Sequence, residues 1–307
     1  MSEGSDLHIV VFGFIFPCPV KRCKGLTPQH ANPEMTSRRD FLKTSSAAAV
    51  GGMLAANLGF PRKTSPAAAN TLKVGLVGCG GCGSSAASQA LNADKNVILT
   101  TVGDIFESQG QGCLAGLKGS DDPIKDRVKV DPDHIFVGLK AYQKVIDSGV
   151  DVVLLATPPG FRPQHLQAAV AAGKHIFAET PMATDAPGVR SVIESVAAAK
   201  KKNLALLAGF CWRYDYGRRE FYKRILDGVI GDVRAVYATY LTGPVKPMPP
   251  ASSRPAGMSD VEWQLSNWYN FTWLSGDGLV EQACHSVDKI SWAMKDVPPL
   301  KAVATGG

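Results

Sequence analysis

A short apolar run that leads into closely spaced glycines constrains the fold of this chain more than any other stretch. Residues 72–77 have the composition of a buried β-strand, and Gly78, Gly80 and Gly83 follow directly. Residues 84–91, rich in small side chains, are typical of a helix. In this G-x-G-x-x-G order the glycines allow a tight turn, close approach of the backbone to a diphosphate and close helix–strand packing. The stretch predicts a dinucleotide site at a helix N-terminus; the alternative is a plain glycine-rich turn.

An acidic residue at the end of the next strand indicates which dinucleotide is bound. Residues 97–102 are rich in β-formers and end at Gly103 and Asp104. Asp104 follows Gly83 by about 20 residues, the spacing that the fingerprint expects. A carboxylate there accepts hydrogen bonds from the ribose hydroxyls of NAD and repels the additional phosphate of NADP. We therefore expect NAD, with NADP less favoured; the alternative is a solvated loop aspartate.

Residues 35–69 have the features of an export signal. Arg38 and Arg39 stand in Ser-Arg-Arg-Asp-Phe-Leu-Lys, which closely resembles the twin-arginine motif. The mild apolar run 46–60 is too short for a membrane span, and the alanines at 67–69 offer a cleavage site. We expect export through the twin-arginine machinery, to the periplasm or otherwise out of the cytoplasm; the alternative is a chance arginine pair. Residues 1–34 are interpreted as an extension from an upstream start codon, so residues 1–69 stand outside the fold prediction.

Charge and cysteine usage exclude other classes of partner. The formal net charge of +6 over 307 residues comes mostly from residues 1–70, so no basic region for nucleic acid remains. Cys79-x-x-Cys82 lies inside the glycine turn, where small residues are needed, and no second C-x-x-C follows. We expect neither a metal site nor a disulfide framework.

Strand and helix patterns alternate from residue 72 to about residue 209. This predicts an α/β fold with a doubly wound parallel sheet, a Rossmann domain, over residues 70–209. The further expected strands are residues 135–137, 151–157, 175–178 and 204–208, and the expected helices are residues 142–146, 163–172 and 185–202. In residues 210–307 we expect a helix over 220–226 and a half-buried strand over 233–241.

Five aromatic residues then cluster within a short stretch. They are Trp263, Trp268, Tyr269, Phe271 and Trp273. Hydrophobic packing explains such a cluster, and so does a wall on which a sugar ring stacks. The residues alone leave both interpretations open.

Four motifs in order along the chain resemble those of one enzyme family. They are residues 77–83, 156–159, 173–181 and 278–288. Together they resemble the Gfo/Idh/MocA oxidoreductases over residues 72–307. The resemblance implies a Rossmann domain followed by an α/β domain with an open, mostly antiparallel sheet that carries the substrate site and often the oligomer contacts. It also implies that the sheet of this chain is incomplete at residue 307 and that the full-length protein is a homo-oligomer.

The resemblance also assigns residues to the site. The implied cofactor contacts are Gly78, Gly80, Gly81, Cys82, Gly83, Asp104, Thr157, Pro158, Pro159 and Glu179, and the implied substrate contacts are Arg213, Asp288 and Trp212. His285 is expected to take the proton of a substrate hydroxyl, because an imidazole titrates near neutrality; the alternative is a core histidine. Glu281 stands four residues earlier, where the family has Asp, and would share one helical face with His285. Thr180 replaces the usual lysine and brings no positive charge to favour an alkoxide.

The resulting expectation is an exported NAD-dependent oxidoreductase that acts on a sugar, polyol or related hydroxylated compound. Two alternatives stay open. One is a glycosidase of the same family that uses NAD without consuming it, and the other is a non-catalytic nucleotide-binding protein, suggested by Thr180.

Replacing both Arg38 and Arg39 by Lys is expected to hold the precursor in the cytoplasm, because the arginine pair defines the export motif. Cell fractionation followed by immunoblotting measures this. Arrival of the double variant in the periplasm would show that the pair is not a signal.

Overall fold

The computed structural model describes residues 8–10, 71–119, 123–243 and 245–304. The export signal expected at residues 35–69 therefore lies outside the described residues. Within the described part of the chain, no helix combines the length and the apolar character that a membrane span needs.

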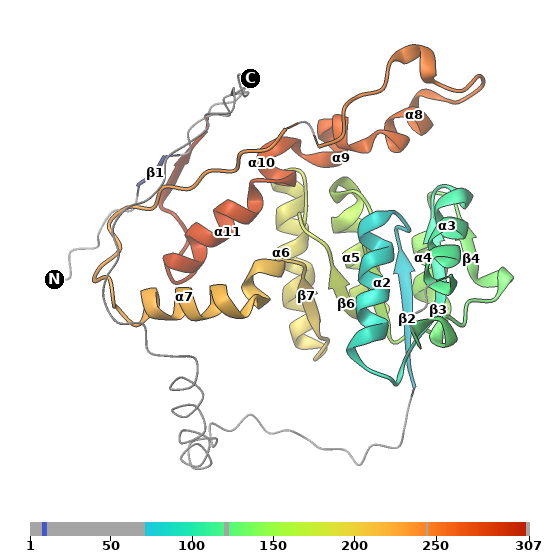
Figure 1. Cartoon of the computed structure of the whole chain (residues 1–307), viewed down its shortest axis with the longest axis horizontal. Helices are drawn as coiled ribbons and strands as arrows, with labels where there is room; N and C mark the ends of the chain where they lie inside the picture. Colours follow the sequence, from blue (N-terminus) through green and yellow to red (C-terminus); the bar gives the residue numbers. More distant parts are fainter. Residues whose placement is uncertain (1–7, 11–70, 120–122, 244, 305–307) are drawn as a thin grey trace, which may run out of the picture. The chain divides into compact units, whose positions relative to one another are not determined.

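A six-stranded parallel sheet is the centre of the described chain (Figure 1). Its strands are β2 (Leu72–Val77), β3 (Val97–Asp104), β4 (Ile135–Val137), β5 (Val152–Leu155), β6 (His175–Ala178) and β7 (Leu206–Ala208). They are ordered β4-β3-β2-β5-β6-β7, and each neighbouring pair is parallel. This is the Rossmann order, so the predicted fold class is confirmed. The order reverses between β2 and β5, and ligands bind such folds at the carboxyl ends of the strands flanking this point.

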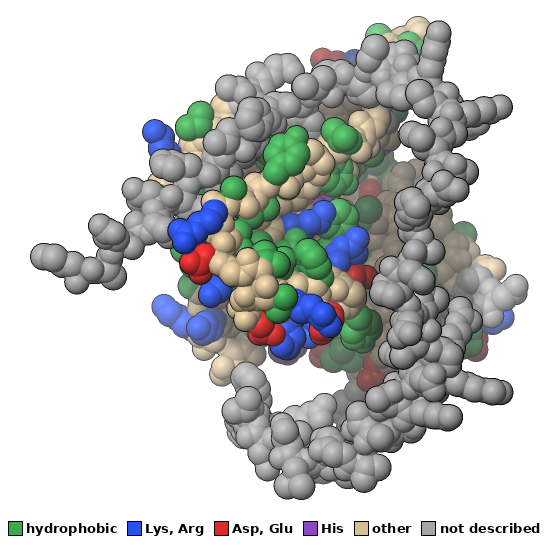
Figure 2. All heavy atoms as spheres, turned by 60° about the vertical axis from the view of Figure 1, so that its left-hand side comes forward, with side chains coloured by type: hydrophobic (Ala, Val, Ile, Leu, Met, Phe, Trp, Pro, Cys, Tyr) green, Lys and Arg blue, Asp and Glu red, His purple; other side chains and the backbone are tan. Residues whose placement is uncertain are grey.

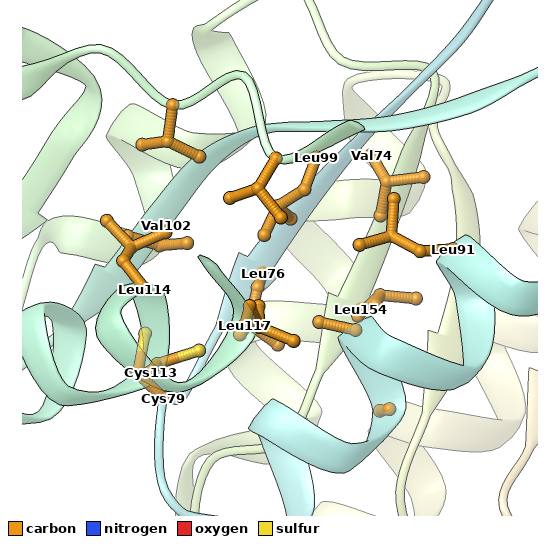
Figure 3. Close-up of a cluster of buried hydrophobic side chains, with 14 of the residues drawn as sticks. Val74, Leu76, Cys79, Leu91, Leu99, Val102, Cys113, Leu114, Leu117 and Leu154 are labelled. Carbon is orange, nitrogen blue, oxygen red and sulfur yellow. The ribbon is translucent and has the colours of Figure 1, made fainter. Parts of the chain in front are cut away.

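Helices cover both faces of the sheet. On one face lie α2 (Gly81–Ala93) and α3 (Glu107–Lys118), and on the other lie α4 (Ala141–Asp147), α5 (Arg162–Ala171) and α6 (Ala186–Lys201). Side chains alternate along β2, so Val74 and Leu76 join the first core cluster while Val77 joins the second. Figure 3 shows the first cluster, where Leu76 is fully buried and Leu114 of α3 is 5% exposed. Burial of each such side chain contributes about 1.5–3 kcal/mol.

The glycine turn after β2 is set by steric contact. Gly78 has a φ of +92°, which favours glycine. A Cβ at Gly83 would lie 1.8 Å from the carbonyl oxygen of Gly78, so α2 can begin at this distance from the sheet only with glycine there. At Gly80 and Gly81 a Cβ would meet no protein atom within 4 Å. The fold therefore requires the first and third fingerprint glycines but not Gly80.

The chain after residue 209 is mainly helical. Its elements are η5 (Cys211–Tyr214), α7 (Tyr216–Leu226), η6 (Ala251–Ser253), α8 (Asp260–Ser266), η7 (Trp268–Asn270), α9 (Thr272–Ser275), α10 (Asp277–Glu281), α11 (Cys284–Ala293) and β8 (Lys301–Val303). Strand β8 pairs in parallel with β1 (His8–Val10). The face that carries α7 and α11 mixes basic, acidic and apolar side chains (Figure 2).

Two expectations for this region were wrong. Residues 233–243 form no strand, and the described residues after 209 contain no antiparallel sheet. A strand needs a neighbour to satisfy its backbone N–H and C=O groups, and this mostly exposed segment has none among the described residues. It is attached by side chains instead: the Tyr240 hydroxyl donates to Gln282 at 2.7 Å, and the Ser286 hydroxyl donates to the carbonyl of Thr239 at 3.1 Å.

Candidate active site

The N-terminus of α2 lies at the carboxyl end of β2 and is open to a ligand. Gly80 occupies the N-cap position, and no side chain caps the helix. The first turn contains no acidic residue that would compete with an anion. Because a Cβ at Gly80 or Gly81 would project away from all protein atoms, glycine here keeps the backbone N–H groups accessible. These features fit the diphosphate of a dinucleotide.

Asp104 holds the glycine turn in place. One carboxylate oxygen accepts a hydrogen bond from the Cys79 N–H at 2.7 Å, and the other accepts from the Phe106 N–H at 3.0 Å. Each oxygen keeps a further lone pair for a ribose hydroxyl. The structure thus places Asp104 where the sequence analysis expected it and adds a structural role that the sequence analysis missed.

The loop between β5 and α5 is fixed by a buried arginine. Arg162 is 2% exposed and donates hydrogen bonds to the carbonyl oxygens of Leu155 and Thr157. The Thr157 hydroxyl lies 3.1 Å from Nδ1 of His165, whose ring stacks on Tyr142 with centroids 4.1 Å apart. Burial, together with the Arg162 charge, lowers the pKa of His165 to about 3, so this imidazole is neutral. The loop that carries Thr157, Pro158 and Pro159 is therefore held in one conformation.

Arg162 also belongs to a charged cluster with the half-buried Glu179 and Glu281, beside the exposed Cys82. Burial raises the pKa of Glu281 to about 7, and the Arg162 charge offsets part of this effect. The same two causes act on Glu179, and the net direction of its pKa is also upward. Nε of Arg162 and Oε2 of Glu281 are buried without a hydrogen-bond partner among the described residues. The cluster thus combines one cation with two carboxyl groups that ionise reluctantly.

His285 lies on α11 among aromatic rings. Its ring is edge-on to Phe210 at 6.1 Å and tilted against Trp212 at 5.3 Å. Burial lowers the pKa of His285; the Asp288 charge opposes this effect and the Lys289 charge adds to it. A neutral imidazole at physiological pH can accept a proton.

A chain of contacts connects His285 to the charged cluster. Gly209 directly precedes Phe210, and a Cβ at Gly209 would lie 2.5 Å from Oε2 of Glu179. Thr180 follows Glu179 at the end of β6 and is half-buried. The structure therefore brings the expected residues Glu179, Thr180 and His285 toward the same end of the sheet.

The expected shared helical face of Glu281 and His285 is wrong. Helix α10 ends at Glu281 and α11 begins at Cys284, with a turn between them. The four-residue spacing therefore does not place the two side chains one above the other. Gly278, whose carbonyl accepts from the Gln282 and Ala283 N–H groups, closes α10 at this point.

The expected substrate clamp, Arg213, is instead a structural cross-link. Its Nε donates to the two carboxylate oxygens of Asp288 at 2.8 and 3.0 Å, and its terminal nitrogens donate to Asp296 at 2.6 and 3.0 Å. These two carboxylates raise the pKa of Arg213. Arg213 and Asp288 thus satisfy each other and join η5 to α11.

Trp212 is also partly engaged by protein groups. The Lys289 ammonium lies 3.4 Å and the Arg218 guanidinium 4.8 Å from the centre of its ring. The Trp212 ring, which the sequence analysis had assigned to substrate binding, therefore contacts two cationic side chains of the protein.

One member of the aromatic cluster has a packing role. Trp273 meets Phe161 edge-on at 6.1 Å and donates from Nε1 to Gln264 at 2.8 Å. A Cβ at Gly160 would lie 2.5 Å from the Trp273 carbonyl oxygen, so α9 rests closely on the loop after β5. For Trp273 the structure favours packing over a sugar-stacking wall.

The environment of the Glu281 carboxyl can be tested by pH titration of stability. Its pKa rises from an ordinary 4.5 to about 7 on folding. Its contribution to stability is therefore full below about pH 4.5 and is lost as the pH rises through about 7. Relative to Glu281→Gln, the free energy of unfolding of the intact protein is expected to fall between these pH values.

Urea denaturation at a series of pH values measures this difference. Glu220→Gln, on the exposed surface of α7, is the matched control and should follow the intact protein. Parallel pH profiles for the intact protein and Glu281→Gln would disprove the buried carboxyl.

Comparison with known proteins agrees with this geometry. Residues 72–210 match the protein-family model GFO_IDH_MocA, described as "Oxidoreductase family, NAD-binding Rossmann fold". Inositol 2-dehydrogenase 2 from Saccharopolyspora erythraea is 25% identical over 227 residues, which cover 74% of this chain and 60% of that protein. The dTDP-3,4-didehydro-2,6-dideoxy-alpha-D-glucose 3-reductase from Actinomadura kijaniata is 26% identical over 183 residues, 59% of this chain and 49% of that protein. The matched region thus spans about half to three-fifths of these relatives.

A solved structure shares the fold. The WlbA dehydrogenase from Bordetella pertussis, in complex with NADH and UDP-GlcNAcA, has a TM-score of 0.53 and 20% identity, covering 73% of this chain and 55% of that one. Together with the strand order, this likeness shows a Rossmann fold. Residues 72–210 thus form a Rossmann domain that matches the model of the NAD-binding Gfo/Idh/MocA oxidoreductases.

Proposed function

We propose that this protein is an NAD-dependent oxidoreductase that transfers a hydride between a carbohydrate-like hydroxylated substrate and the nicotinamide. One observation carries the proposal: Glu281, whose pKa is raised to about 7, acts electrostatically on Cys82 in the first turn of α2, where the helix N-terminus is open, and His285 packs on Phe210 just beyond β7. The family match of residues 72–210 and the relatives named as inositol dehydrogenase and sugar-nucleotide reductase support it.

The backbone at Gly80 and Gly81 and the side chain of Asp104 bind the cofactor in this proposal. Bound NAD supplies the hydride acceptor, and the N–H groups at Gly80 and Gly81 hold its diphosphate. Asp104 accepts from the ribose hydroxyls through the lone pairs that Cys79 and Phe106 leave available.

His285 and Glu281 are the groups that transfer protons in the proposed reaction. His285 accepts the hydroxyl proton, because its pKa is held below that of an ordinary imidazole. Glu281 can hold a proton near neutral pH, and the buried Arg162 favours its ionised form when that proton leaves. Thr180 contributes a neutral hydroxyl where a lysine would contribute a charge.

The proposal includes export through the twin-arginine pathway, on the strength of Arg38 and Arg39 alone. Such export moves folded proteins, so the dinucleotide can bind before the chain leaves the cytoplasm.

Binding of NAD in preference to NADP is expected, because the Asp104 carboxylate repels a ribose phosphate. Calorimetry of the intact protein with each dinucleotide measures the preference, and tighter NADP binding would contradict it. Asp104→Ser should reduce the preference. Since Asp104 also holds the Cys79 and Phe106 N–H groups, the melting temperature of the variant must be recorded beside its affinities.

His285→Ala is expected to lower turnover by about 10²–10⁴-fold, the usual effect of losing a general acid or base. The assay uses the full chain, NAD and a panel of inositols, sugars and glycosides, and follows NADH. His134→Ala, a half-buried histidine beside β4, is the matched control and should keep full activity. Full activity of His285→Ala would remove the catalytic assignment.

The same assay separates the alternatives. NADH accumulation marks a dehydrogenase, whereas glycoside cleavage without net NADH marks a hydrolase that recycles its cofactor. NAD binding without turnover of any compound in the panel would favour a non-catalytic protein. Thr180→Ala should cost little activity if His285 alone transfers the proton, and Thr180→Lys should raise turnover by stabilising the alkoxide.

A further inference from the structure

Two buried thiols that the proposed reaction does not use meet beneath the glycine turn. Cys79 lies between Gly78 and Gly80 and is 2% exposed; Cys113 lies on α3 and is 5% exposed. The Cys79 thiol donates to the carbonyl oxygen of Gly103 at 3.6 Å. Both cysteines belong to the first core cluster, and Figure 3 shows their sulfur atoms next to each other. The structural partner of Cys79 is therefore Cys113, whereas Cys82 of the C-x-x-C sequence is exposed on α2.

The surroundings make one of the two thiols reactive. The neighbouring Cys79 thiol lowers the pKa of Cys113 to about 7, with help from the Ser84 hydroxyl and against the opposing effects of burial and the Asp104 charge. The same contact, together with burial, raises the pKa of Cys79. Cys113 is thus the thiol of the pair that ionises more readily. A thiolate is the nucleophilic form of cysteine.

We propose that Cys79 and Cys113 form a reversible disulfide, with a hydroperoxide as oxidant, that couples the oxidation state of the protein to dinucleotide binding. The Cys113 thiolate attacks one peroxide oxygen, so an S–O bond forms and the O–O bond breaks, and hydroxide leaves from hydrogen peroxide or an alkoxide from an organic hydroperoxide. The Cys79 sulfur then attacks the Cys113 sulfur, so the S–S bond forms and the S–O bond breaks. The departing hydroxide and the Cys79 proton make water. Both sulfurs are oxidised and the peroxide is reduced.

The position of Cys79 explains why the bond would reach the cofactor site. Its N–H holds Asp104 at 2.7 Å, and its carbonyl accepts from the Ser84 hydroxyl of α2 at 3.2 Å. A disulfide joins sulfurs at about 2.05 Å, far closer than two unbonded thiols. Leu114 and Leu117 anchor α3 in the core, so the turn moves rather than the helix. The groups that hold the diphosphate and the ribose are then displaced together.

The experiment treats the full chain with hydrogen peroxide and maps its peptides without reduction. Calorimetry then compares NADH binding by the oxidised protein, the untreated protein and the oxidised protein after dithiothreitol. The expected results are a Cys79–Cys113 cross-linked peptide and NADH binding weakened by about tenfold, that is by about 1.4 kcal/mol, and restored by dithiothreitol.

Matched variants assign the effect. Cys113→Ser is expected to show neither the cross-link nor the change in affinity. If this variant has a lowered melting temperature, Cys113→Ala replaces it. Cys211→Ser removes an exposed thiol outside the glycine turn and should behave as the intact protein. A Cys79–Cys82 cross-link, or no cross-link, would overturn the pairing, and a cross-link with unchanged NADH affinity would overturn the coupling. The effect on affinity rests on the proposed cofactor. If the reduced protein binds no NADH, the proposed function fails while the peptide map still decides the disulfide.

Discussion

The close contact of α2 with the carbonyl oxygen of Gly78 is the constraint on which the rest of the structure depends. Only a glycine at position 83 lets the helix start so near the strand, since any Cβ would overlap that oxygen. The contact brings the positive end of α2 to the carboxyl end of β2 and leaves the N–H groups at Gly80 and Gly81 accessible. Asp104 and Arg162 then fix the segments on either side of it. Arg162 in turn positions the charged cluster that it forms with Glu179 and Glu281.

The fold of residues 72–209 could be predicted where apolar runs end at glycine or proline. Strands β4 and β6 have the bounds that the sequence indicated, because each is a continuous apolar segment with clear limits. Helix α3 was not predicted, because glycines at 110, 112 and 116 obscure the helical spacing of its buried side chains. At residues 233–241 a strand was predicted that the structure does not form. Alternation of apolar and polar residues indicates which face a strand would bury, but it does not show whether a neighbouring strand is present to pair with it.

Only the part of the candidate site that lies within one short stretch of sequence could be predicted. The fingerprint and Asp104 follow from spacing along one βαβ unit. Arg162 could not be found in this way, because nothing in its local sequence shows that Glu281, from a distant helix, lies near it. Arg213 was assigned to substrate because its partner Asp288, 75 residues away in the chain, is invisible to a local pattern.

The glycine turn after β2 and the loop after β5 are each held by a side chain that forms hydrogen bonds with main-chain atoms. Asp104 binds the N–H groups of Cys79 and Phe106, and Arg162 binds the carbonyl oxygens of Leu155 and Thr157. Main-chain atoms are the same whatever side chain they carry. The residues that receive these bonds can therefore differ in side chain while the two segments keep their positions. The side chains that this arrangement requires are those of Asp104 and Arg162, together with glycine at positions 78 and 83.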